Sequence, residues 1–230
     1  MTKVGLSIVI PFYNEGKQTE IVLKTALKDI SQHIKNFEIL AVDNGSKDDT
    51  GKIIINLSKK DKRIVLVKIV KNIGYGYGVR FGLSKAKGNC LGWIDGDGQF
   101  EMDNIIKAYN ILKLSNCGLV KGCRISRADS LQRNIVSVFF NLVFNILYFN
   151  KVKDVNSKPK LITRECFNSF VITSNDWFID AEIIIKSLQN NFKICELPLV
   201  FKKRASGKSN VKFSTLLEFL YNLIRFRFAV

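Results

Sequence analysis

The stretch CLGWIDGDGQ, residues 90–99, decides the fold class. It opens with a short apolar segment that predicts a buried strand, and it closes with two carboxylates, Asp95 and Asp97, in a glycine-rich turn. Similar apolar segments alternate with helical patterns upstream, which favours crossover connections and an α/β fold with a mostly parallel central sheet flanked by helices. We expect strands at residues 6–10, where Pro11 should stop the strand, and at 37–42, 64–70 and 90–94, with helices at 16–33, 49–59 and 75–86.

Polar side chains follow several of these strands. Ligands of open parallel sheets bind at the carboxyl ends of the strands, so these side chains mark a candidate site. Two carboxylates two residues apart in a flexible turn can face one hard cation, and oxygen ligands suit Mg²⁺ or Mn²⁺. The alternative is a turn that uses Asp and Gly only for its backbone conformation. The polar residues are Asn14 and Glu15, Asp43 and Asn44, and Asp95 and Asp97.

The glycine-rich stretch before the third predicted helix matches neither the dinucleotide-binding fingerprint nor the P-loop motif. Gly74 and Gly76 begin a G-x-G pattern, but a dinucleotide fingerprint needs glycine where Val79 or Phe81 stands. No G-x-x-x-x-G-K-[ST] sequence occurs. Dehydrogenase and P-loop functions are therefore disfavoured, and the glycines are expected to bring the start of a helix close to the sheet.

Charge and cysteine content narrow the functional classes. The chain carries 36 Lys and Arg against 20 Asp and Glu, a net charge of +16, which favours polyanionic partners: nucleic acid, acidic lipid or phosphorylated substrates. A merely soluble, lysine-rich surface is the alternative.

Five cysteines without a CxxC pair argue against a disulfide framework or a zinc site and favour a reducing compartment.

Four motifs occur in an order that is typical of one enzyme family. They are SIVIPFYNE at 7–15, VDNGSKDDT at 42–50, Asn72-Ile73-Gly74 followed by Gly78 and Gly82, and DGDGQ at 95–99. With them the chain resembles glycosyltransferase family two and, within it, the dolichyl-phosphate and polyprenyl-phosphate sugar synthases. The resemblance implies a GT-A type nucleotide-sugar-binding fold.

The resemblance also implies a site, residue by residue. Nucleotide contacts fall on Pro11, Tyr13, Glu15, Asp43 and Asp95. A Mg²⁺ or Mn²⁺ ion and the diphosphate fall on Asp95, Asp97 and Gln99. The late F-x-x-R-x-x-G-x-S motif, which closes over phosphates, corresponds to Phe201, Arg204, Gly207 and Ser209, and the expected catalytic set is Asp95, Asp97 and Arg204. Acids that face the acceptor correspond to Asp180 and Glu182.

Two positions depart from the family pattern. Asn44 stands where the family commonly has a second acid. The segment Ser157-Lys158-Pro159-Lys160-Leu161 replaces an S-G-F-R-x-F-like sequence, and Lys158 is expected to contact the acceptor phosphate instead.

The chemistry of the acceptor determines which other residues matter. A sugar hydroxyl must lose a proton to a base, whereas a lipid phosphate is already anionic and needs positive charge to hold it near the donor's diphosphate. Arg133, Ser137 and Asn141 recur every fourth residue, which puts them on one helical face. We expect this face to grip the acceptor phosphate, unless it is only a polar helix start. The full expected phosphate set is Arg124, Arg133, Ser137, Lys158, Arg204 and Ser209.

Two apolar segments suggest contact with a membrane. The helix at about 130–150 is too short to cross about 30 Å of hydrocarbon, so it is expected to lie in the interface, or else to be a core helix or a dimer contact. The tail, residues 213–230, interleaves apolar residues with Arg225 and Arg227. We therefore expect a catalytic domain at 1–212 and an apolar, basic, membrane-proximal tail at 213–230.

Together these inferences predict a metal-dependent, inverting hexosyltransferase. The donor is GDP-mannose or UDP-glucose, and the acceptor is a polyprenyl phosphate. The enzyme is expected to be cytoplasmic and peripheral on an anionic membrane face, with a membrane-anchoring partner or a second copy of the chain as further partners. The alternatives are a transferase acting on a glycan hydroxyl, a scaffold subunit with a decayed site, and a basic nucleic-acid-binding module, which leaves the acidic motifs unexplained.

Overall fold

The computed structural model describes residues 4–98, 101–126, 131–148, 152–200 and 213–228. Strands alternate with helices through the first half of the chain, as the sequence predicts. The elements follow in the order β1 (Leu6–Phe12), α1 (Lys17–His33), β2 (Phe37–Asn44), α2 (Thr50–Lys60), β3 (Ile64–Ile69), α3 (Tyr75–Lys85), β4 (Cys90–Trp93), α4 (Met102–Leu114), β5 (Leu119–Ser126), α5 (Leu131–Tyr148), β6 (Lys160–Thr163), α6 (Arg164–Asn168), α7 (Ile179–Gln189), β7 (Ile194–Val200) and α8 (Phe213–Phe228).

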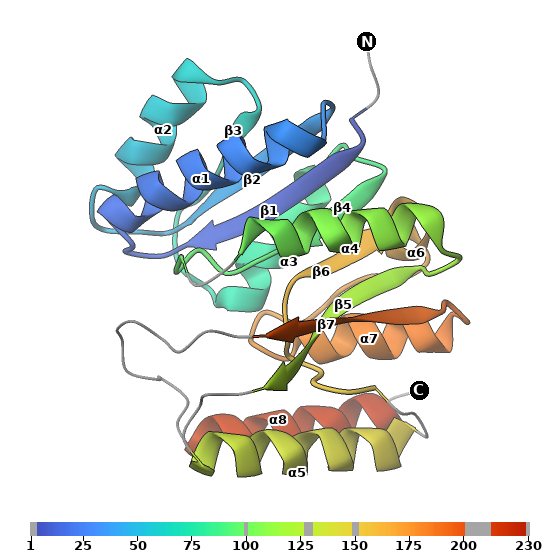
Figure 1. Cartoon of the computed structure of the whole chain (residues 1–230). Coiled ribbons are helices and arrows are strands. Elements are labelled where there is room, and N and C mark those ends of the chain that lie inside the picture. The colour runs from blue at the N-terminus through green and yellow to red at the C-terminus, as the bar shows by residue number, and fades with distance from the viewer. Residues whose placement is uncertain (1–3, 99–100, 127–130, 149–151, 201–212, 229–230) are drawn as a thin grey trace.

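One twisted sheet runs through the molecule (Figure 1). Its seven strands are ordered β3-β2-β1-β4-β6-β5-β7. Only β6 is antiparallel to its neighbours, and the other pairings are parallel, so the mostly parallel sheet is confirmed. Because β1 lies between β2 and β4, the residues that follow these three strands meet at one edge of the sheet.

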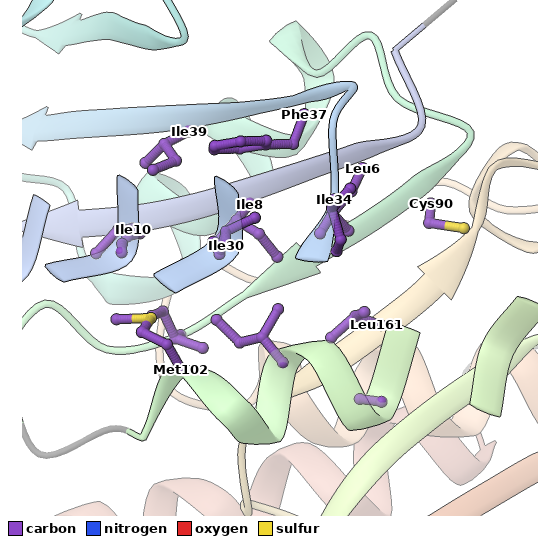
Figure 2. Close-up of a cluster of buried hydrophobic side chains, with 14 of the residues drawn as sticks. Leu6, Ile8, Ile10, Ile30, Ile34, Phe37, Ile39, Cys90, Met102 and Leu161 are labelled. Carbon is purple, nitrogen blue, oxygen red and sulfur yellow. The ribbon is translucent and has the colours of Figure 1, made fainter. Parts of the chain in front are cut away.

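Alternating side chains of the central strands build a core on each face of the sheet. From β1, Ile8 and Ile10 point toward α1, α2 and α4, where Figure 2 shows them packed with Ile30 and Met102. Val9, between them, points to the opposite face and packs with residues of α3 and α7. All seven residues of β1 are buried, as expected for a strand covered on both faces.

Strand β1 continues through Pro11 to Phe12, whereas the sequence predicts that Pro11 stops it. Backbone directions explain the difference. The Ile94 amide donates to the Val9 carbonyl (3.2 Å), so Val9 faces β4, and Pro11, two residues later, faces the same way. The pairing of β1 with β4 ends at Val9 opposite Trp93, so the missing N–H of Pro11 costs no ladder hydrogen bond.

Helices α5 and α8 lie side by side along the bottom of Figure 1, below β7 and α7. The Tyr148 hydroxyl of α5 donates to the Leu223 carbonyl of α8 (2.9 Å), and the rings of Phe178 and Phe226 are 4.8 Å apart. The segment expected to be a membrane-proximal tail is therefore, over residues 213–228, a helix packed against the rest of the protein. In the part of the chain that the structure describes, no helix is both long and apolar enough to cross a bilayer.

Two cysteines are neighbours across the sheet. Cys117, just before β5, and Cys195, in β7, have Cα atoms 6.0 Å apart, within the span of a disulfide, and the structure joins them. The sequence argues against a framework of several disulfides, and it does not predict this single pair. Sequence spacing could not reveal it, because the pairing of β5 with β7 brings together positions 78 residues apart.

Gly82 offers a test of how tightly α3 packs on the sheet. A Cβ atom at this position would lie 2.4 Å from Val9 Cγ1 and 2.9 Å from Val42 Cγ2, and valine side chains have little freedom to move away. Gly82→Ala should lower the free energy of unfolding by about 1–3 kcal/mol in urea denaturation. Ser84→Ala, on the exposed side of the same helix, is the control and should stay within about 0.5 kcal/mol of wild type; equal effects would contradict the close packing.

Candidate functional site

The turns after β1 and β2 are tied to each other. The Lys47 amide donates to Asn14 Oδ1 (2.8 Å), and the Asn14 amide donates to Ser46 Oγ (3.1 Å). The Ser46 amide in turn donates to Asp43 Oδ1 (2.9 Å). Four of the residues expected to bind a nucleotide therefore share this edge: Pro11, Tyr13, Glu15 and Asp43. Asp43 is buried, whereas the Tyr13 ring is half exposed.

Negative charge gathers beside these turns. Burial raises the pKa of Glu15, and repulsion from Asp97 and Asp48 raises it further. A Cβ atom on Gly96 would lie 2.6 Å from the Pro11 carbonyl oxygen, so the turn after β4 lies against the end of β1, with carboxylates on both sides. Asp95 and Asp97 are partly exposed there, at the carboxyl end of β4.

The donor set fits a hard divalent cation. Among the described residues no group of three His, Cys, Asp or Glu side chains is arranged to hold a metal ion by itself. Mg²⁺ and Mn²⁺ do not require such a cage, because they keep waters and take oxygens from bound phosphates besides one or two carboxylates. Asp95 and Asp97 supply those carboxylates, and the predicted third ligand, Gln99, lies outside the described residues.

Asp95 is held from one side by side chains distant in sequence. The Tyr75 hydroxyl donates to Asp95 Oδ1 (2.8 Å), and the Lys158 ammonium lies 3.5 Å from the same oxygen. The Tyr75 ring is stacked on Trp177, with centroids 4.2 Å apart and planes within 9°. Burial, then Asp95, raises the pKa of Tyr75 well above its usual value, so the phenol stays protonated and remains a donor.

Behind Asp95 lies a buried cluster of charges centred on Asp180. Its carboxylate accepts from Lys158 (2.9 Å), Lys160 (2.8 Å) and the Trp93 indole (3.1 Å). Burial would raise the pKa of Asp180, but the two lysines hold it below its usual value. When both lysines are protonated, Asp95 and Asp180 together balance their charge.

The two lysines of this cluster are not equivalent. Burial alone would lower the pKa of Lys158, but Asp180 and Asp95 raise it above its ordinary value. Burial lowers the pKa of Lys160 to about 7. Asp180 offsets this desolvation only in part, because the same carboxylate is also paired with Lys158. Lys158 is thus the stable cation next to Asp95, and Lys160 is the titratable member of the pair.

The turn that carries Trp177 is clamped to the glycines at the start of α3. The Tyr77 amide donates to the Asn175 carbonyl (3.0 Å). A Cβ on Gly74 would lie 2.2 Å from that carbonyl oxygen, and Gly74 has a φ of +146°, which favours glycine. Asn44 stands where the family commonly has an acid. Its side-chain amide donates to the Gly74 carbonyl (3.1 Å), a contact that an ionised aspartate could not make.

Glu182, expected to face the acceptor, is fully buried and supports the same turn. Its Oε1 atom accepts from the Thr173 amide (2.8 Å), and its Oε2 atom accepts from the Ser174 amide (2.8 Å). Lys186 Nζ lies 2.6 Å from Oε1. Burial would raise the pKa of Glu182, but these hydrogen bonds keep it low.

Arg124 is bound by Asp154, which pairs with it through two hydrogen bonds of 2.6 Å. The positive charge of Arg124 nevertheless repels that of Lys158 and lowers the pKa of Lys158 slightly. Of the predicted polar face of α5, Asn141 is described, and its Oδ1 atom accepts from the Val155 amide (2.9 Å). Asn141 therefore contacts the loop that precedes Lys158.

The structure does not describe every expected site residue. Gln99, Arg204 and Ser209 lie outside the described residues, and Arg133 and Ser137 lie in α5 with side chains that are not described. Sequence reasoning also missed Tyr75, Trp177 and Lys160. An aromatic residue beside the glycines was the only local signal for Tyr75, and the roles of the other two arise from contacts far along the chain.

Comparison with known proteins identifies the family. The profile of Glycosyl transferase family 2 matches residues 7–177, most of the chain. The chain belongs to glycosyl transferase family 2. It is therefore a glycosyltransferase, and the family and enzyme class predicted from the four motifs are confirmed.

Two sequence relatives of this family 2 chain are named for the same activity. The "Dolichyl-phosphate beta-glucosyltransferase" of Dictyostelium discoideum is 27% identical over 98% of this chain and 74% of its own length. The "Dolichyl-phosphate beta-glucosyltransferase ALG5A" of Trichomonas vaginalis is 26% identical over 96% and 72%, respectively. The relatives thus match the subgroup that the sequence resembles.

Solved structures confirm the GT-A type fold. The glucosyl-3-phosphoglycerate synthase of Mycobacterium tuberculosis, in complex with Mn²⁺, UDP and glucosyl-3-phosphoglycerate, superposes with a TM-score of 0.77 at 17% identity, covering 99% of this chain and 81% of the other. Its complex with Mn²⁺, UDP-glucose and phosphoglyceric acid gives the same TM-score at 16% identity, covering 99% and 80%.

The low pKa of Lys160 gives the folded family 2 domain a measurable pH dependence. Between pH 7 and 9 the unfolded chain keeps this lysine protonated while the folded chain releases the proton, so the free energy of unfolding should rise with pH, by up to about 1.4 kcal/mol per unit. Lys160→Met should flatten that rise in urea denaturation at several pH values. Because Lys121 also has a lowered pKa, the difference between the two proteins is the informative quantity, and parallel curves would contradict the assignment.

Proposed function

We propose that this chain transfers glucose from UDP-glucose to a polyprenyl phosphate of the dolichyl type, with inversion at the anomeric carbon and with a divalent cation. The activity for which these two relatives are named supports the sugar and the acceptor. Neighbours of the same fold hold Mn²⁺ with UDP or UDP-glucose, which supports the nucleotide and the cation. Of the two donors that the sequence leaves open, UDP-glucose is therefore favoured over GDP-mannose.

One structural observation favours a phosphate acceptor over a hydroxyl. Transfer to a hydroxyl requires a base, and the acids expected on the acceptor side are Asp180 and Glu182. Both are buried, Asp180 between two lysines and Glu182 among backbone amides and Lys186, and both pKa values are lowered. Such carboxylates are poor proton acceptors, whereas a phosphate acceptor needs none.

The residues of this chain then have distinct roles. Pro11, Tyr13, Glu15 and Asp43 line the nucleotide, and Asp95 and Asp97, with Gln99, would hold the cation. When bound, that cation neutralises charge on the leaving diphosphate as a Lewis acid. Tyr75 and Lys158 fix the orientation of Asp95, so less reordering is needed when the donor binds.

Positive charge for the two phosphates is proposed to come from both halves of the chain. Arg204 clamps the diphosphate with paired donors. Lys158 lies 3.5 Å from Asp95 Oδ1 and supplies a described cation beside the proposed donor site. The proposed acceptor-phosphate set keeps Arg124, Arg133, Ser137, Lys158, Arg204 and Ser209.

Helices α5 and α8 are proposed to rest on an anionic membrane surface. Their inner sides are packed, with Phe144 and Leu223 buried, while an outer group of apolar side chains remains exposed. Arg225 and Arg227 are exposed among them. Apolar side chains beside cations suit the interface of an anionic bilayer, where the lipid acceptor resides. The exposed apolar group consists of Val138, Phe139, Leu142, Ile146, Tyr221, Ile224 and Phe228.

Asp97 tests the enzyme assignment directly. With Mg²⁺ or Mn²⁺, wild type should form lipid-linked glucose from UDP-glucose and a short polyprenyl phosphate, and EDTA should abolish the product. Asp97→Ala should reduce transfer at least a hundredfold while leaving the unfolding transition in place, because the cation loses a carboxylate. Asp103→Ala, which removes an exposed acid of α4, is the control. Normal turnover by Asp97→Ala would refute the cation role of Asp97. Faster transfer from GDP-mannose than from UDP-glucose would refute the proposed donor.

The membrane proposal has its own test. The double variant Arg225→Gln/Arg227→Gln should sediment with vesicles containing phosphatidylglycerol roughly thirtyfold more weakly than wild type, since each of the two cations near an anionic surface adds about 1 kcal/mol. Lys59→Gln/Lys60→Gln removes the same charge from α2, at the far side of the molecule in Figure 1, and should bind as wild type does. Equal loss in both variants would indicate nonspecific attraction by net charge instead.

A further inference from the structure

Trp177 is a large aromatic residue that lies half exposed at the protein surface. Half of it, 51%, is accessible, while Phe178 beside it is buried. One face of its indole is covered by the stacked Tyr75 ring. A large apolar surface left open beside polar groups is typical of a ligand contact rather than of core packing.

The turn that presents Trp177 is held from three directions. Arg80 of α3 donates to Asn175 Oδ1 (2.8 Å), and Asn222 of α8 donates to Asp176 Oδ2 (3.2 Å). The amide of Phe178 donates to Asp176 Oδ1 (2.8 Å). Because these contacts fix the backbone on both sides of Trp177, the indole is presented in a preorganised position.

A single side chain, Tyr75, links this indole to the proposed cation site. The ring that backs it belongs to Tyr75, whose hydroxyl donates to Asp95 Oδ1. The Lys158 ammonium lies 5.0 Å from the Tyr75 centroid and 5.9 Å from the Trp177 centroid, so all four side chains form one contiguous group. Tyr75 therefore connects the indole, through its stacked ring, to the carboxylate that is proposed to hold the cation and the diphosphate.

We infer that Trp177 is the platform on which the hexose of the donor stacks. The inference rests on the proposed function, because it takes a nucleotide sugar as the ligand. A pyranose ring has an apolar C–H face that packs against an aromatic face through dispersion and burial of apolar area. The hexose is the part of such a donor that is bonded to the diphosphate, whereas the nucleoside end is assigned to residues of β1 and β2. Trp177 is thus a binding residue that sets where the anomeric carbon lies.

The test separates the hexose from the rest of the donor. Dissociation constants for UDP and for UDP-glucose are measured by calorimetry on the full chain with Mn²⁺. Trp177→Ala should weaken UDP-glucose about tenfold and UDP less than twofold, and Trp177→Phe, which keeps an aromatic face, should restore most of the loss. Tyr77→Ala removes another stacked aromatic of α3, the partner of Phe81, and should not affect UDP-glucose selectively.

Three results would overturn the inference. They are an equal loss for both ligands, no loss for either, or an unchanged affinity for UDP-glucose accompanied by a raised KM for polyprenyl phosphate. The last result would assign Trp177 to the isoprenoid chain. Failure of the proposed function is distinguishable, because it would appear as wild-type protein that binds neither nucleotide or transfers no glucose to any polyprenyl phosphate.

Discussion

The sharing of one buried carboxylate, Asp180, by two lysines is the constraint around which the site is arranged. A buried lysine is stable only when it is paired, and two lysines on one carboxylate leave a surplus charge. Asp95 offsets that surplus, because Lys158 lies between the two acids. The carboxylate at the tip of β4 is therefore part of a buried charge network as well as a candidate cation ligand. This arrangement accounts for the fixed position of Asp95, while burial lowers the pKa of Lys160, which shares Asp180 with Lys158.

The second organising feature is the contact between the α3 glycines and the turn before α7. Gly74 and Gly76 let the backbone of Asn175 and Asp176 approach closer than any side chain would allow. That approach brings Trp177 onto Tyr75 and connects the site to α8 through Asn222. This turn is one link between the proposed membrane layer and the proposed donor site, and the contact of Asn141 in α5 with the Val155 amide is a second link among the described residues.

Much of the fold and half of the site could be predicted from the sequence. Alternating apolar and helical patterns are local, and so is the DGDGQ turn, which is why the parallel sheet and the acids Asp95 and Asp97 were predicted. The roles of Tyr75 and Trp177 were not, because they depend on the stacking of two rings far apart in the sequence. The role of Lys160 was not, because it depends on a buried contact with Asp180 that no local pattern indicates. The order of β6, β5 and β7 was equally inaccessible, and with it the neighbouring Cys117 and Cys195. The side chains of the late basic loop lie outside the described residues, so their assignment stays a prediction.

The central claim is that this family 2 enzyme needs no base, because its acceptor is already an anion and its buried acids are occupied. The most direct measurement compares two acceptors that differ in one group, a short polyprenyl phosphate and the corresponding polyprenol, with labelled UDP-glucose and Mn²⁺. The account predicts glucosylated lipid from the phosphate and none above background from the alcohol. Comparable transfer to the alcohol, or to a glycan hydroxyl, would contradict it.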